Sequence, residues 1–204
     1  MKKVVLALAV VFATVAGVNA QTTSSSSAKV KVNVELNPFQ SIEIGSGATS
    51  GGNGYGDEVN LVYNTANDYK TGVSKLVAKQ LKVSSVGSGY KVKATLGFNS
   101  GNSGKFNKVL GGGVENIDAS QLLEIAIGKS GGANGITTGT TAAANMEFGP
   151  FGATSTGESS VLDQELDVKY FGKKLDETMV KNLFGNQKTQ AKYSIDVVYT
   201  ITTN

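Results

Sequence analysis

Apolar and polar residues alternate along most of this chain, a pattern typical of β-strands with one buried and one solvent-facing side. The clearest example is residues 90–98, where Tyr, Val, Ala, Leu and Phe are separated by lysine, threonine or glycine. Similar alternation occurs at residues 30–36, 42–44, 59–63, 79–85, 121–128, 161–172 and 193–201. Glycine-rich segments separate these runs and supply turns. The pattern predicts an all-β fold, an antiparallel two-sheet β-sandwich.

One segment departs from this period. Residues 174–187, KLDETMVKNLFGNQ, place Leu175, Met179, Leu183 and Phe184 near one face of a helix. Asp176 suits the N-cap and Gly185 suits the end. The sequence therefore predicts one short helix near the C-terminus, before the last strand.

The first alternating run allows two interpretations. Its apolar face consists of Val30, Val32, Val34 and Leu36, and its polar face of lysine, asparagine and glutamate. Such a strand either pairs within its own sheet or adds to the sheet of a neighbouring molecule, where backbone hydrogen bonds would hold it.

The N-terminal twenty residues have the features of a secretory signal peptide. Lys2 and Lys3 precede an apolar run, and small residues end it, so we expect cleavage before Gln21. Glutamine at that position is similar to many exported proteins of Bacteroidota. We expect residues 1–20 to be the signal peptide, 21–28 a flexible serine-rich leader and 29–204 a single domain. The protein would then be extracellular, on the cell surface or associated with the outer membrane.

Composition excludes several kinds of chemistry. Cleavage removes two of the 19 basic residues and lowers the formal net charge from +3 to +1, so charge gives no support for nucleic-acid binding. The chain has no Cys, no His and no Arg. Thiol and imidazole catalysis are therefore excluded, as is bidentate guanidinium recognition. We expect no enzyme activity, no catalytic residues and no cofactor.

Acidic residues offer only weak metal candidates. Asp57, Glu58 and Asp68 lie in loop-like segments without the alternating oxygen donors of a calcium loop. The acids at 163, 165 and 167 share one strand face, where they are spaced about 7 Å apart, too widely to converge on one cation. We therefore expect no metal site.

Two tyrosines outside the strand pattern are candidates for ligand binding. Tyr55 and Tyr69 lie in segments rich in glycine and asparagine, where a ring can stack on a sugar. This favours an alternative function, a carbohydrate- or peptidoglycan-binding module. The opposing interpretation folds these rings onto the rim of the sandwich.

A second alternative is a small outer-membrane β-barrel, since the protein is exported and its strands alternate. Barrel strands run to about ten residues and carry aromatic girdles at both membrane interfaces. Here several runs are shorter, the aromatics are sparse, and the last residue is Asn204.

The two ends of the chain resemble a known group. The stretch LNPFQSIEIG after the first run, and the closing YSIDVVYTITTN, are similar to fimbrial-subunit and spore-coat-U-like β-sandwiches of secreted bacterial proteins. The resemblance implies an Ig-like or fimbrial-like sandwich with a structural or adhesive role at the cell surface. It further implies self-association into a filament or pilus by donation of a terminal strand, with Val30, Val32, Val34 and Leu36 filling pockets of the next subunit.

Overall fold

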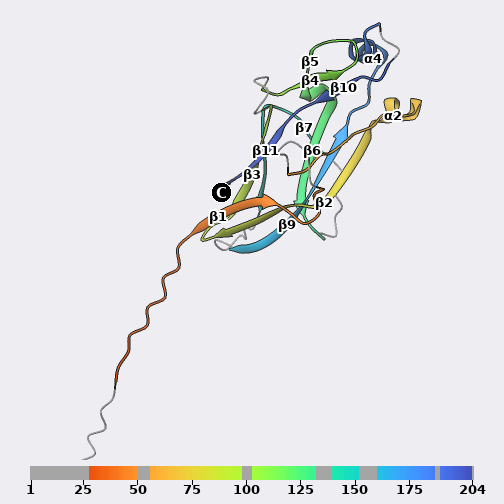
Figure 1. Ribbon diagram of the computed structural model, residues 1–204. Helices are drawn as coiled ribbons and strands as arrows, with labels where there is room; N and C mark the ends of the chain where they lie inside the picture. Colours follow the sequence, from red (N-terminus) through yellow and green to blue (C-terminus); the bar gives the residue numbers. More distant parts are fainter. Residues whose placement is uncertain are drawn as a thin grey trace, which may run out of the picture. The chain divides into compact units, whose positions relative to one another are not determined.

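The computed structural model describes residues 28–49, 56–97, 103–131, 139–151, 160–186 and 189–203. The predicted signal peptide lies outside these residues. The chain divides into a unit Met1–Leu36 and a unit Asn37–Asn204, which are described separately. All strands and helices of the description belong to the second unit (Figure 1).

The second unit is built mainly of strands. These are β1 Phe39–Ile44, β2 Val73–Val86, β3 Tyr90–Leu96, β4 Lys105–Leu110, β5 Asn116–Asp118, β6 Leu123–Lys129, β7 Thr140–Thr141, β8 Asn145–Phe151, β9 Val161–Gly172, β10 Lys192–Ser194 and β11 Val197–Thr203. Three short helices join them: α2 Ala66–Thr71, α3 Ala119–Leu122 and α4 Glu177–Phe184.

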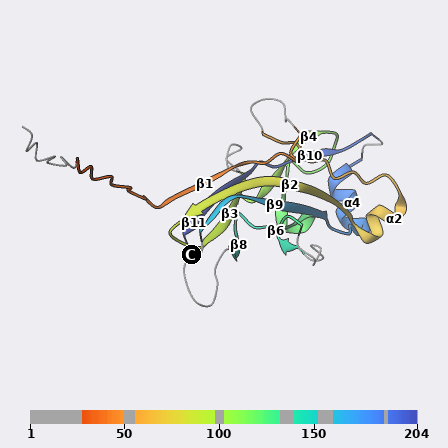
Figure 2. The same cartoon turned by 90° about the horizontal axis from the view of Figure 1, so that it is seen from below.

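The strands form three antiparallel sheets. The largest has the order β1-β2-β9-β6-β7, the second β11-β3-β8 and the third β10-β4-β5. Figure 2 shows the long strands β2 and β9 side by side in the five-stranded sheet. The predicted all-β, antiparallel fold is confirmed.

The core lies between the five-stranded sheet and the sheet of β11, β3 and β8. From β3, Val92, Ala94 and Leu96 are fully buried, as the alternation predicts. From β9, Leu166 and Val168 are equally buried and belong to the same cluster. Each large aliphatic side chain buried in this way stabilises the fold by about 1.5–3 kcal/mol. The two sheets therefore form the two layers of a sandwich.

The predicted C-terminal helix is confirmed as α4. The side chain of Asp176 accepts a hydrogen bond from the backbone N–H of Met179 at 2.7 Å, and the helix ends at Gly185. The sequence pattern did not predict α2 or α3. The alternating residues 59–63 were expected to be a strand and are not one, although Val59 and Leu61 still pack against the core.

Two non-glycine residues with positive φ interrupt the long strands. Asp163 has φ 53°, and the β2–β9 pairing shifts register close to it. A bulge adds one residue, so residues before and after it that would share a face of a regular strand lie on opposite faces. Leu162, expected on the buried face with Leu166, is consequently 68% exposed.

The second interruption, at Lys79 with φ 54°, organises the segment that follows β1. The bulged backbone presents the carbonyl oxygens of Lys79 and Gln80, which accept hydrogen bonds from Gly47 N at 3.1 Å and Gly45 N at 2.7 Å. A Cβ on Gly47 would lie 1.6 Å from the carbonyl oxygen of Ala78. Only glycine permits this approach.

Candidate functional site

The segment that carries the candidate donor residues is unpaired. Residues 28–38 belong to no strand, so the expected strand at 30–36 is not formed, and no ladder among the described strands includes it. Its apolar side chains are almost fully exposed: Val30 at 84%, Val32 at 80%, Val34 at 79% and Leu36 at 87%. Pairing within its own sheet, one of the two interpretations of this run, is therefore not observed.

The second unit has an open sheet edge at its C-terminal strand. β11 pairs with β3 along its whole length, from Val197 opposite Leu96 to Thr203 opposite Tyr90. On its other side, β11 has no ladder partner among the strands that the structure describes. β1, the edge of the five-stranded sheet, comes within 8 Å of β11 between Cα atoms but does not pair with it. Two neighbouring edges are thus left unjoined.

Apolar side chains are incompletely covered along these edges. Val197, Tyr199 and Ile201 of β11 pack against the core but are only partly buried, in contrast to the fully buried residues of β3. On β1, Phe39 is 48% exposed and Ile44 is 46% exposed. Exposed apolar surface beside unpaired backbone is the combination that accepts an additional strand.

A chain of hydrogen bonds lies at this edge. The hydroxyl of Tyr170 donates to Gln80 Oε1 at 2.9 Å, and the side-chain amide of Gln80 donates to Asp57 Oδ2 at 2.7 Å. The hydroxyl oxygens of Tyr170 and Tyr199 lie 2.7 Å apart. Since the Tyr170 proton is directed to Gln80, Tyr199 donates to Tyr170. Every member of this chain has a partner, as buried polar groups require.

Burial of these hydroxyls changes their acidity. Loss of solvation raises the pKa of Tyr170 to about 12 and raises the pKa of Tyr199 well above its ordinary value. Both phenols are neutral near pH 7, so they act as hydrogen-bonding groups and not as bases.

The three acids considered for a metal site are not brought together. Asp57 anchors its own turn, where it accepts hydrogen bonds from Thr49 N at 3.0 Å and Glu58 N at 2.8 Å. Glu58 lies 3.9 Å from the ammonium group of Lys192. Within the described ranges, no group of three metal-binding side chains occurs.

Asp68 has a structural role at the start of α2. It forms a capping box with Thr65, in which each side chain accepts from the other residue's backbone N–H. Hydrogen bonds from Thr65 N and then Asn64 N lower the pKa of the Asp68 carboxyl. The spacing of these two residues in the sequence is a helix-start signal that the loop prediction overlooked.

The acidic face of β9 is neutralised by lysines. Glu165 lies 2.8 Å from Lys79 Nζ, and Asp163 lies 3.6 Å from Lys82 Nζ. Asp167 accepts a hydrogen bond from the backbone N–H of Lys79 at 2.7 Å, within the bulge. These contacts join the bulged part of β2 to β9.

Of the two candidate sugar-binding tyrosines, only Tyr69 belongs to the described residues. Tyr55 lies outside the described residues. Tyr69 belongs to α2 and not to a loop, and its ring packs against Tyr63 with centroids 5.4 Å apart. Its carbonyl accepts from Leu175 N at 2.8 Å. The Tyr69 ring is thus packed against Tyr63.

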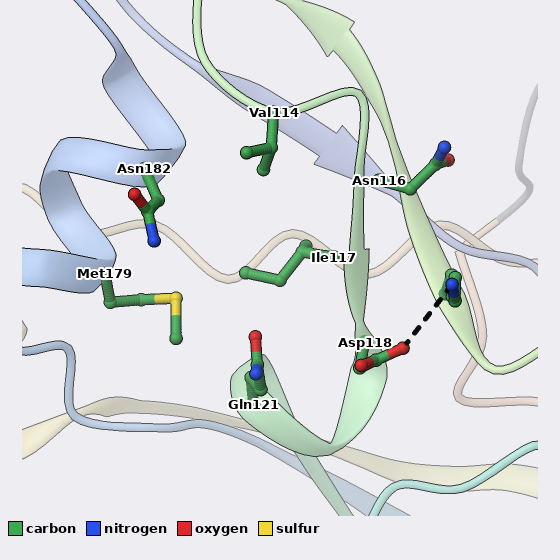
Figure 3. A pocket seen from close by; sticks show the side chains of 8 residues that line it. Val114, Asn116, Ile117, Asp118, Gln121, Met179 and Asn182 are labelled. Atoms are coloured by element: carbon green, nitrogen blue, oxygen red, sulfur yellow. Dashed lines mark ion pairs between the residues drawn. The ribbon is translucent and has the colours of Figure 1, made fainter.

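The sequence pattern did not indicate a cavity of about 170 Å³ that lies between α4, β5 and α3 (Figure 3). Its lining includes Val114, Ile117, Met179, Gln121 and Asn182. These residues come from segments far apart in the chain, and no local motif links them.

Comparison of the chain with protein-family models, curated proteins and solved structures finds no match. In the part of the chain that the structure describes, no helix is both long enough and apolar enough to cross a membrane.

Proposed function

We propose that this protein is an exported, non-enzymatic surface protein that assembles into a filament by strand donation. In this proposal residues 30–36 of one subunit pair with the open edge of β11 in the next. The observation that carries it is the exposed, alternating apolar face of a segment that forms no strand. The partly buried core residues of β11 provide the matching surface.

The donor segment and the acceptor strand β11 have the same length. The candidate donor run spans seven residues, and β11 also has seven. A donated strand would satisfy the unpaired backbone groups of β11, while its four apolar side chains leave water. Such side chains stabilise an association by about 1.5–3 kcal/mol each when fully buried, before the cost of ordering the segment.

The link between the donor segment and β1 favours exchange between molecules. Only Asn37 and Pro38 separate Leu36 from Phe39. A two-residue hairpin would need positive φ at its first or at both central positions. Proline fixes φ near −65° and holds the preceding residue extended. The segment is therefore disfavoured from folding back beside its own β1.

The test compares the mature chain, residues 21–204, with a variant that begins at Asn37. We expect polymers of the mature chain in negative-stain electron microscopy and light scattering. The shortened variant should remain monomeric with an unchanged circular dichroism spectrum of its strands. A mature chain that is monomeric at all concentrations would contradict the proposal, as would a shortened chain that polymerises equally well.

A matched pair of substitutions tests the face of the donor strand. Val32→Asp places a charge on the apolar face, whereas Asn33→Asp places the same charge on the opposite face. Strand donation predicts that Val32→Asp prevents polymerisation and that Asn33→Asp leaves it nearly unchanged. Equal effects of the two substitutions would exclude a role for the apolar face.

A further inference from the structure

The cavity shown in Figure 3 is lined by apolar side chains and three amides, of which Asn116 points away from it. Val114, Ile117 and Met179 point into it from different sides, and the side chains of Asn182 and Gln121 project into the same space from α4 and α3. Lys105 and Asp118, which also line the cavity, form an ion pair at 4.0 Å. In Figure 3, one oxygen of the Asp118 carboxylate is directed toward Lys105.

Gln121 and Asn182 are both exposed to solvent, and their side-chain amides are available to a ligand. Among the described residues, none forms a hydrogen bond with the side chain of Gln121 or Asn182, although the backbone carbonyl of Asn182 accepts from Val114 N at 3.0 Å. Each side-chain amide offers two N–H donors and one carbonyl acceptor. Together the two side chains can bind a ligand group that both donates and accepts hydrogen bonds.

The walls of the cavity are held in place. The hydroxyl of Tyr193 lies 2.9 Å from the carbonyl oxygens of both Val114 and Leu183 and so joins the β4–β5 loop to the end of α4. Gly113 permits the loop to approach α4 closely, because a Cβ at this position would lie 2.3 Å from the carbonyl oxygen of Leu183. A site whose walls are fixed before binding loses little entropy on binding.

We infer that this cavity binds the acetamido group of an N-acetylated sugar residue in a surface or cell-wall glycan. The methyl of an acetamido group suits the apolar side chains, while its N–H and C=O complement the amides of Gln121 and Asn182. The two charged residues of the described lining, Lys105 and Asp118, form an ion pair with each other, which favours a neutral ligand. The volume of about 170 Å³ suits one small group and lies below the roughly 300–1,000 Å³ of pockets for larger ligands.

This inference is independent of filament formation, because the cavity shares no residue with the donor segment or with β11. It also differs from the sugar site predicted at Tyr55 and Tyr69. A glycan-binding cavity would give a surface protein an adhesive role whether it acts as a monomer or as a polymer.

The test is calorimetric titration of the mature chain with a tetramer of N-acetylglucosamine and, separately, with a tetramer of glucose. We expect binding of the first and at least about tenfold weaker binding of the second, which lacks the acetamido group. Loss of one neutral hydrogen bond costs about 0.5–1.5 kcal/mol, so Asn182→Ala and Gln121→Ala should each weaken binding by roughly 2- to 13-fold.

Asn60→Ala is the matched control, since Asn60 is an exposed amide that does not line the cavity. It should leave affinity unchanged, and thermal unfolding should show that all variants remain folded. Three results would overturn the inference: equal affinity for the two tetramers, no binding of the N-acetylated tetramer at millimolar concentration, or unchanged affinity in both cavity variants.

Discussion

The hydroxyl oxygens of Tyr170 and Tyr199 lie 2.7 Å apart and join the two main sheets of the sandwich. Tyr170 belongs to β9 in the five-stranded sheet, and Tyr199 belongs to β11 at the edge of the other sheet. The contact fixes β11, whose outer edge pairs with none of the strands that the structure describes. It therefore couples the stability of the fold to the surface at which we propose that subunits join.

The first prediction concerns this contact. Tyr170→Phe removes the hydroxyl that donates to Gln80 and accepts from Tyr199, and it leaves both partners without that bond. We expect the free energy of unfolding to fall by about 1–3 kcal/mol, measured by denaturant titration. Tyr69→Phe is the control, because no described residue forms a hydrogen bond with the Tyr69 hydroxyl. Equal losses in the two variants would contradict the role given to Tyr170.

Alkaline pH provides the second prediction. Burial raises the pKa of Tyr170 to about 12 in the folded protein, whereas the unfolded chain has a tyrosine pKa of about 10. The contribution of this phenol is therefore constant below about pH 10 and falls above it, by up to about 1.4 kcal/mol per pH unit until about pH 12. Unfolding titrations across this range should show the loss, with a smaller slope in Tyr170→Phe.

Ultraviolet absorbance of tyrosinate supplies an independent check on the same prediction. The buried tyrosines should ionise only as the protein unfolds, later than the exposed ones. A protein that remains folded while all its tyrosines ionise together near pH 10 would show that these hydroxyls are not protected.

The third prediction concerns the glycines that cross the β2 bulge. Gly47→Ala places a Cβ 1.6 Å from the Ala78 carbonyl oxygen, so the backbone must move, and we expect a loss of about 3 kcal/mol or more in unfolding free energy. Gly131→Ala is the control. Its Cβ would meet no atom within 4 Å, and only its φ of 73° opposes the change, at about 1 kcal/mol. A Gly47 variant as stable as the Gly131 variant would contradict the close approach.

Much of the fold could be predicted because local patterns determine it. The alternation in β3 and β9 requires one buried face, and Asp176 and Gly185 define the ends of α4. The bulge at Asp163 could not be predicted, since a non-glycine residue with positive φ leaves no signal in a hydrophobic pattern. Residues 59–63 show the converse. Val59 and Leu61 alternate with polar residues because both pack against the core, although this segment does not pair as a strand.

The candidate site was only partly predictable. The apolar face of residues 30–36 is visible in the sequence, but the open edge of β11 depends on which strands pair, a long-range property. The cavity beside α4 brings Gln121 and Asn182 together from distant segments, which alternation alone does not reveal.

Amide hydrogen exchange of residues 30–36, measured separately in the monomeric and high-mass fractions of the mature chain, tests strand donation most directly. In the monomer these amides have no ladder partner among the described strands, so they should exchange rapidly. The account predicts strong protection of these amides, and added protection of β11, in the high-mass fraction. Rapid exchange of residues 30–36 in assembled material would contradict it.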